Sequence, residues 1–260
     1  MTGTDDRAFR HNAGESLAAS PCDLWFVDLA DGAGALEHEE RLHPRLSPDE
    51  VQRAEVIKDS GVRRHWRAAH IALRFCLERF AGDAWRGVPF TIAPGGRPAL
   101  PEGAPHFSLS HSDGWALIAL SGHGPIGVDL ERVRPRKISG ARRLGVEAYA
   151  LALAEGAPLP VSSDARFVQA WCRIEALAKA DGRGIGKVLT EAGLIGRVEG
   201  HCGAPSTASQ VFRVSDIALG ESNSSGFVAA MALPHSLANT SGWPPGVHFD
   251  LRNLLGAVSG

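Results

Sequence analysis

An apolar run that ends in two carboxylates, Ile126 to Glu131, is the feature that most constrains how this chain folds. The run reads Ile-Gly-Val-Asp-Leu-Glu, which predicts a strand, and side chains two residues apart in a strand lie on the same face. Asp129 and Glu131 therefore share one face at the strand's end, a position where functional sites are commonly built. Taken alone, such a pair also fits a solvated surface or ordinary salt bridges.

A second pair of charged residues lies in the segment Trp171 to Ala180, whose pattern predicts a helix. Glu175 and Lys179 are four residues apart and share one side of that helix. On their own they also fit a surface ion pair worth about 0.3–0.5 kcal/mol. Together with Asp129 and Glu131 they form the oxygen-rich set that a hard cation such as Mg²⁺ binds, along with waters and substrate phosphates.

A third group of residues adds cations to this acidic set. Gly95-Gly96-Arg97-Pro98 predicts a turn that presents Arg97, and the strand pattern that follows ends at Ser110 and His111. The segment from Trp115 to Leu120 is the returning strand of a predicted hairpin. A single histidine at a turn is more often structural than functional. An arginine, a histidine and a lysine that converge on carboxylates indicate a polyphosphate substrate, because the cations bind the phosphates and the carboxylates bind Mg²⁺.

Taken together, these motifs resemble those of the broad-specificity, Sfp-like class of phosphopantetheinyl transferases. That family has an apolar-Gly-apolar-Asp-x-Glu strand, a Trp-x-x-Lys-Glu-x-x-x-Lys helix, a Gly-Lys/Arg-Pro turn and a Ser-His strand end. All four elements occur here in the family's order between residues 95 and 187, and weaker similarity reaches back to Leu46-Ser47-Pro48 and forward to residues 226–233. The resemblance implies transfer of the 4′-phosphopantetheine arm of coenzyme A to a serine of an apo acyl or peptidyl carrier protein, with release of 3′,5′-ADP.

The resemblance also implies roles for individual residues of the acidic set. Asp129, Glu131 and Glu175 match the family's Mg²⁺ ligands. Glu175 also matches the residue proposed as general base for the carrier serine, directly or through water. Lys179 matches the lysine that contacts the phosphates and assists the leaving group. Glu175 and Lys179 are therefore the predicted catalytic residues.

Further matches concern coenzyme A, the implied co-substrate. Ser110 and His111 match the pair beside the pyrophosphate and the 3′-phosphate, and Arg97 matches the basic residue of the turn. Arg53 matches a basic residue on the first helix that reaches the 3′-phosphate. Lys179 belongs to this binding set as well.

The chain departs from the family pattern in two regions. Ile174 stands where a lysine usually precedes the helical glutamate, which puts activity or substrate choice in question. Glu50 and Val51 stand where many members are basic. Binding of coenzyme A near the first helix then depends on Arg53 or on further arginines of that region, which are Arg63, Arg64 and Arg67.

Composition excludes several other classes. The 260 residues, 44% hydrophobic and 22% charged, suit a soluble globular protein of one large or two small domains. The net charge of −2 gives no global basic field for nucleic acid. No apolar run is long enough to span a membrane, and the N-terminus has no apolar signal core. The cysteines show no metal-binding spacing, and Cys76 and Cys172, predicted to be buried, suit a reducing cytoplasm.

The basic residues are unevenly placed, and one cluster follows the Asp129 strand. Its members are either a solvated face or a docking surface for an acidic helix of a carrier protein. They are Arg132, Arg134, Arg136, Lys137, Arg142 and Arg143.

The order of predicted elements indicates an α+β fold with two similar α/β halves in a pseudo-twofold arrangement, which the family resemblance also implies. We expect a disordered N-terminus over residues 1–20, an N-terminal half over 21–123, a C-terminal half with the metal site over 124–234, and a tail of unassigned structure over 235–260. Coenzyme A would bind between the halves of a monomer.

Local patterns predict most elements. Ser47, Pro48 and Glu50 form a capping box that starts a helix. Further helices are predicted over residues 63–80, 140–154 and 164–181, and strands over 24–29, 126–130, 211–217 and 227–233. Residues 182–187 are predicted to form a cap and loop, since they lack the first glycine and the Ser/Thr of a phosphate-binding loop.

Two other functions fit the same acidic residues. One is a different Mg²⁺-dependent phosphohydrolase or nucleotidyl transferase, which would act on nucleotides without a carrier protein. The other is a non-catalytic relative that binds carriers, in which Ile174 marks lost chemistry. Retention of all three carboxylates and Lys179 favours the transferase over that relative.

Overall fold

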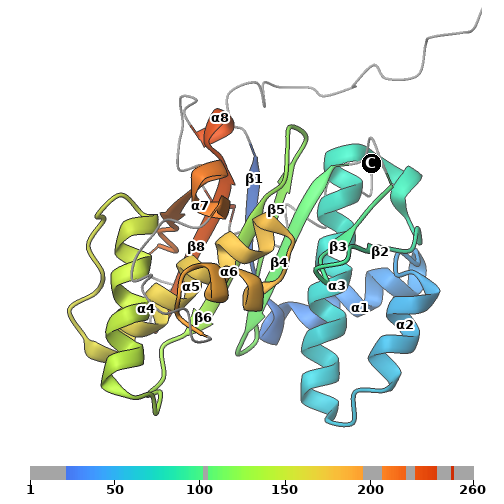
Figure 1. Cartoon of the computed structure of the whole chain (residues 1–260). Helices are drawn as coiled ribbons and strands as arrows, with labels where there is room; N and C mark the ends of the chain where they lie inside the picture. Colours follow the sequence, from blue (N-terminus) through green and yellow to red (C-terminus); the bar gives the residue numbers. More distant parts are fainter. Residues whose placement is uncertain (1–21, 102–104, 196–206, 221–225, 239–246, 249–260) are drawn as a thin grey trace, which may run out of the picture.

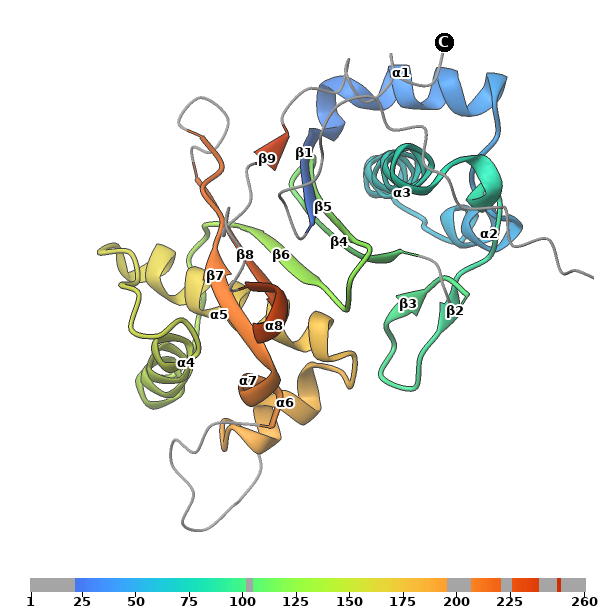
Figure 2. The same ribbon diagram turned by 90° about the horizontal axis from the view of Figure 1, so that it is seen from above.

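The computed structural model describes residues 22–101, 105–195, 207–220, 226–238 and 247–248 (Figure 1). Within these ranges the chain forms a mixed α+β fold with a four-stranded, a three-stranded and a two-stranded sheet. Helices α1 to α3 lie on one side of the molecule and α4 and α5 on the other, with the strands between them (Figure 1, Figure 2). No helix in the described part is long and apolar enough to cross a membrane.

The four-stranded sheet has the order β4-β5-β1-β9. Its strands are β1 (Asp23–Asp28), β4 (His106–Ser112), β5 (Trp115–Ser121) and β9 (Val247–His248). The predicted hairpin is confirmed: β4 and β5 pair antiparallel, with Ser112 opposite Trp115. Asp113 and Gly114 close it at φ 47° and 80°. Such a two-residue turn requires positive φ at both positions, which an Asp-Gly pair adopts at low cost.

Helices α1 (Leu29–Leu42) and α3 (Ser60–Ala81) pack on one face of this sheet, and α2 (Pro48–Glu55) packs against α3. A short 3₁₀ turn at Asp83–Trp85 follows α3. The predicted capping box of α2 is present. Helix α3 begins three residues before its predicted start and ends at Ala81, one residue beyond its predicted end, with Gly82 as its C-cap. Helix α1 was not predicted, because its glycines weaken helix propensity; burial of Leu29, Ala33 and Leu36 stabilises it instead.

The three-stranded sheet has the order β6-β8-β7, and its pairs are antiparallel. The strands are β6 (Gly127–Arg132), β7 (Phe212–Asp216) and β8 (Phe227–Pro234), each within two residues of its prediction. Helices α4 (Gly140–Leu153) and α5 (Ser163–Asp181) pack with this sheet. On the other face of β6, Val128 and Leu130 share a core with β1 and β5, so the two sheets are packed together.

Smaller elements complete the described part, and they were not predicted as such. A small hairpin, β2 (Thr91–Ile92) and β3 (Pro98–Ala99), carries the predicted Gly-Gly-Arg-Pro turn. The others are α6 (Ile185–Glu191), α7 (Thr207–Val211) and α8 (His235–Ala238). Helix α6 replaces the end of the loop predicted over 182–187, and α8 and β9 give structure to parts of the tail left unassigned. Residues 1–20, expected to be disordered, lie outside the described residues.

Candidate active site

The close packing of α5 on β6 depends on Gly127. A Cβ atom built at this position would lie 2.1 Å from the Ala176 carbonyl oxygen and 2.4 Å from the Ala180 amide nitrogen. Any side chain here would push the helix off the strand. Glycine lets the α5 backbone rest directly on β6, which brings Lys179 beside Asp129, two residues further along the same face.

Asp129 is the buried centre of the acidic set, with 2% of its surface exposed. Its Oδ1 accepts hydrogen bonds from Lys179 Nζ at 2.7 Å and from Ser110 Oγ at 2.9 Å. Its Oδ2 is buried and has no hydrogen-bond partner within the described residues. The neighbouring Cys172 thiol donates to the Val228 carbonyl oxygen, 3.7 Å away. Burial raises the pKa of this thiol, and the Asp129 carboxylate lies close enough to raise it further. A buried carboxylate oxygen without a donor is rare and calls for a ligand or ion.

Three serines on β4 hold β6 in place beside the first sheet. Ser108, Ser110 and Ser112 accept hydrogen bonds from alternate backbone amides of β6, those of residues 128, 130 and 132, at 3.0, 3.2 and 3.2 Å. The hydroxyls replace the backbone ladder that two adjacent strands would otherwise make. Ser110 thus has a structural role as well as its contact to Asp129.

Glu131 and Glu175 flank Asp129 and are more exposed to solvent. Burial raises the pKa of Glu175 above its usual value; the Asp129 charge adds to the rise, Lys179 opposes it, and Glu131 adds again. Burial also raises the pKa of Glu131, followed by the Asp129 charge, while Arg136 lowers it. The three carboxylates therefore lie close enough to disfavour one another's charge.

The three carboxylates offer the oxygen ligands that a Mg²⁺ ion binds. Among the described residues no three Asp, Glu, His or Cys side chains are gathered closely enough to hold a metal as they stand. The chemistry of the donors nevertheless fits, because three mutually repelling carboxylates and an unused buried oxygen of Asp129 suit a hard divalent cation.

A cavity of about 410 Å³ lies between the elements that carry these residues, and we call it the central cavity. One wall, the α5 wall, presents Glu175, Ala178 and Lys179. The opposite wall, the α3 wall, presents His70 and Leu73 of α3 with His111 of β4. The β2–β3 turn closes the cavity with Arg97, and the other apolar lining residues include Phe90, Phe107 and Ile185.

The two basic groups contributed by β4 and the β2–β3 turn differ in their surroundings. Burial lowers the pKa of His111, and the charges of His70, Lys179 and His65 lower it further. Arg97 donates from Nη1 to the Ala180 carbonyl oxygen at 3.0 Å, at the C-terminal end of α5 where a cation is favourable. Its guanidinium has further donors, so it can bind this carbonyl and an anion together.

The structure thus brings most of the predicted residues to one place. Arg97, His111, Glu175 and Lys179 line the central cavity, and Ser110 and Asp129 lie directly behind Lys179. Glu131 lies near enough to Asp129 to feel its charge but does not line the cavity. Arg53 lies apart: it is exposed on α2 and does not line this cavity. Of the other arginines considered, Arg67 is bound by two hydrogen bonds to Glu37.

The α5 position that departs from the family pattern faces the protein interior, as does the residue before it. Ile174 is fully buried in the core formed by α4, α5 and the second sheet. Arg173 is also buried; it pairs with Asp216 at 2.7 Å and donates to the carbonyl oxygens of Ala150 and Ala157. Neither side chain points at the central cavity, so Ile174 removes no cation from it.

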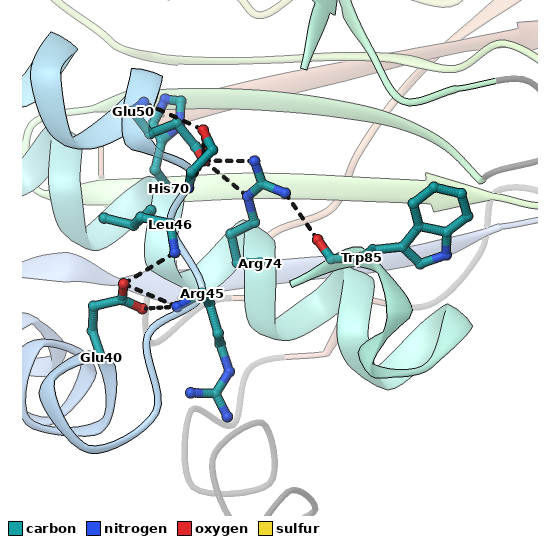
Figure 3. A network of polar contacts seen from close by, with 8 residues as sticks. Glu40, Arg45, Leu46, Glu50, His70, Arg74 and Trp85 are labelled. Carbon is teal, nitrogen blue, oxygen red and sulfur yellow. Dashed lines mark hydrogen bonds and ion pairs between the residues drawn. The ribbon is translucent and has the colours of Figure 1, made fainter. Parts of the chain in front are cut away.

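Glu50, noted in the sequence as a missing base, is a structural anchor behind the α3 wall (Figure 3). Its carboxylate accepts from Arg74 Nη2 at 2.6 Å, from His70 Nδ1 at 2.9 Å and from the Ser47 backbone at 2.9 Å. Burial alone would raise the pKa of Glu50, but bonds from His70 and Arg74, the charge of Arg74 and the Ser47 bond lower it to about 2. Sequence reasoning identified its capping role and missed the other two partners.

The amino-acid sequence is similar to those of several curated proteins, although no family model matches the chain. The 4′-phosphopantetheinyl transferase HetI of Nostoc sp. is 32% identical over 181 residues, which are 66% of this chain and 73% of HetI. A Synechocystis sp. protein whose name assigns the same activity provisionally is 31% identical over 153 residues, 56% of this chain and 61% of that relative. The 4′-phosphopantetheinyl transferase psf-1 of Bacillus pumilus is 26% identical over 157 residues, 60% and 66% of the two chains.

These matches rest on long stretches of sequence in several relatives, and the motifs around the central cavity are those expected of them. This chain belongs to the 4′-phosphopantetheinyl transferase family. It spans roughly two thirds of the length of the curated relatives that it matches.

Proposed function

We propose that this protein transfers the 4′-phosphopantetheine arm of coenzyme A to a serine of an apo acyl or peptidyl carrier protein and releases 3′,5′-ADP. The observation that carries the proposal is the central cavity itself. It sets the cations of Arg97 and Lys179 and the imidazole of His111 around Glu175, in front of the buried carboxylate of Asp129. Family membership supports the same reaction.

The reaction requires the serine oxygen to attack the phosphorus that carries the pantetheine arm. The bond from that phosphorus to the bridging oxygen of the diphosphate breaks, and 3′,5′-ADP leaves with the negative charge. Glu175 takes the serine proton, directly or through one water, and its raised pKa suits a base that works near neutral pH. Lys179, Arg97 and His111 stabilise the charge that develops on the phosphate oxygens.

Mg²⁺ fits this proposal as a cofactor held by Asp129, Glu131 and Glu175. When bound, the ion would neutralise diphosphate charge and orient it. Lys179 now lies on Asp129 Oδ1, so it keeps one oxygen of this carboxylate fixed and leaves Oδ2 for a further partner. Ser110 fixes the same Oδ1 from the other side.

The finer features of the family are part of the proposal. They include the Sfp-like class, two pseudo-twofold halves over residues 21–123 and 124–234, and a monomer that works in the cytoplasm without binding nucleic acid or membranes. The carrier would dock on the basic cluster after β6, which includes Arg132, Arg134 and Arg136. Two of these are exposed arginines that pair with Asp113, and the third pairs with Glu131, so the cluster lies beside the acidic set.

The test is intact-mass spectrometry of an apo acyl carrier protein incubated with this protein, coenzyme A and Mg²⁺. We expect the carrier to gain the mass of one phosphopantetheine arm, and chelation of the metal to stop the gain. A carrier variant with alanine at the modified serine is the control and should stay unchanged. No mass gain with any of several apo carriers, although coenzyme A binds, would contradict the proposal.

A further inference from the structure

One histidine on the α3 wall of the central cavity is not assigned by the family motifs. His70 lines the cavity, and 18% of its side chain is exposed. Its ring stacks on Trp66 with centroids 3.7 Å apart. Its Nδ1 lies 2.9 Å from Glu50 Oε1 (Figure 3). The ring is therefore held from one side and one edge.

The bond to Glu50 determines which nitrogen is left for a ligand. With a pKa of about 2, Glu50 is a carboxylate at neutral pH and only accepts hydrogen bonds. Nδ1 of His70 therefore carries a hydrogen and donates it. The second ring nitrogen, Nε2, bonds to no other group in the described part of the chain, and it belongs to a side chain that faces the cavity.

None of the described arginines on α2 and α3 lines the cavity beside His70. Arg74, one turn further along α3, donates to Glu50 and to the Trp85 carbonyl oxygen. Arg67 is paired with Glu37, and Arg53 is exposed on α2. His70 and Leu73 are the α3 residues that line the cavity among the described residues.

The basic side chains of the cavity lie close to one another. His70 lies near enough to His111 to influence its charge, and Lys179 does the same from the α5 wall. A space lined by two histidines, a lysine and Arg97, with apolar side chains around them, is suited to a ligand that carries more than one phosphate.

We infer that His70 binds a phosphate group of coenzyme A through Nε2, and that Glu50 is the residue that positions its ring. This inference rests on the proposed function and adds a binding residue to it. A phosphate on the cavity side and the Glu50 carboxylate on the other place the imidazole between two anions. A ring that carries a hydrogen on each nitrogen donates to both anions at once.

The experiment is a calorimetric titration of coenzyme A into the full-length protein and three variants, without any carrier. His70→Gln keeps a donor for Glu50 and removes the charge. His70→Arg restores a cation that can reach Glu50 and a phosphate together. His38→Gln, on the exposed face of α1, is the matched control. Each protein is also titrated with 3′-dephospho-coenzyme A.

We expect His70→Gln to weaken coenzyme A binding about tenfold, the usual effect of losing one charge-assisted hydrogen bond. His70→Arg should recover most of that loss, and His38→Gln should bind as the wild type does. If His70 binds the 3′-phosphate, His70→Gln and wild type will bind the dephospho ligand equally; if it binds the diphosphate, both ligands weaken by the same factor.

Two results would overturn the inference. One is wild-type affinity in His70→Gln; the other is His70→Arg binding as weakly as His70→Gln, since a purely structural role is not rescued by charge. Failure of the wild type to bind coenzyme A at all would instead remove the proposed function, and the inference with it.

Discussion

Two buried carboxylates stand behind opposite walls of the central cavity, and they differ in how completely they are bonded. Glu50, 5% exposed, receives hydrogen bonds on both oxygens from Ser47, His70 and Arg74. Asp129, 2% exposed, receives bonds on Oδ1 alone, and its Oδ2 has no partner among the described residues.

The difference separates a structural carboxylate from a reactive one. Burial of a charge is tolerated when every lone pair is used, and then the group stabilises the fold. A buried oxygen left without a donor costs free energy. Because this one lies at a cavity beside two further carboxylates, we expect it to bind a ligand or an ion. On this basis the α5 wall carries the chemistry and the α3 wall carries binding and support.

The largest effect should follow from neutralising Glu175 on the α5 wall. Glu175→Gln removes the base and should lower transfer to the carrier about a thousandfold, within the range for general-base catalysis. Circular dichroism and thermal unfolding should match the wild type, because this side chain is partly exposed at the cavity. Transfer at the wild-type rate would contradict the role of Glu175 as the general base on the α5 wall.

Ile174 tests the other face of the same helix. Ile174→Lys restores the residue common in the family, but here it would bury an ammonium group in the core, at a cost of about 4 kcal/mol in the free energy of unfolding. Ile174→Leu, similar in volume, is the control and should cost about 1 kcal/mol or less. Urea titration measures both. Wild-type stability in the lysine variant would mean that position 174 reaches solvent or the cavity.

Gly127 tests the contact that places α5 against β6. Gly127→Ala puts a methyl group against the Ala176 carbonyl oxygen, which should cost about 3 kcal/mol and move Lys179 away from Asp129. Gly34→Ala on exposed α1, where a Cβ meets nothing within 4 Å, should instead stabilise by up to about 1 kcal/mol. Equal unfolding free energies for the two variants would contradict the close packing.

Acid should lower the free energy of unfolding through Glu50, which supports the α3 wall. Its pKa in the folded protein is about 2, below the ordinary 4.5, so its stabilisation is complete above about pH 4.5 and is lost as pH falls towards 2. That shift corresponds to about 3 kcal/mol. Urea unfolding between pH 6 and pH 3 should show a steeper loss for the wild type than for Glu50→Gln. Parallel pH profiles would show that Glu50 is not held as the structure has it.

Much of the α5 wall could be predicted from the sequence because its residues are set by local spacing. Asp129 and Glu131 two apart in a strand, and Glu175 and Lys179 four apart in a helix, fix which side chains share a face before any tertiary contact is known. The Ser-His hairpin and the turn at Arg97 follow from equally local signals.

Apart from His111, the α3 wall could not be predicted, since its key contact joins Glu50 and His70, which lie 20 residues apart in the chain. From the sequence, Glu50 is predicted to cap a helix and stands where many family members have a basic residue. No local pattern predicts its contact with His70. The available signal was the four-residue spacing of Trp66, His70 and Arg74, which puts these side chains on one side of α3. Helix α1 was missed for a related reason, because tertiary burial outweighs its glycine content.

The most direct test of the comparison is the single-turnover rate of carrier modification at saturating coenzyme A for Asp129→Asn and Glu50→Gln, corrected for the folded fraction. We predict that Asp129→Asn slows transfer by at least about a hundredfold, since it removes a carboxylate that would hold Mg²⁺ at the reacting diphosphate and that fixes Lys179. Glu50→Gln should bind coenzyme A more weakly yet transfer within a few-fold of the wild type once saturated. Equal slowing in the two variants, or a slower Glu50→Gln, would contradict the division between a reactive and a supporting wall.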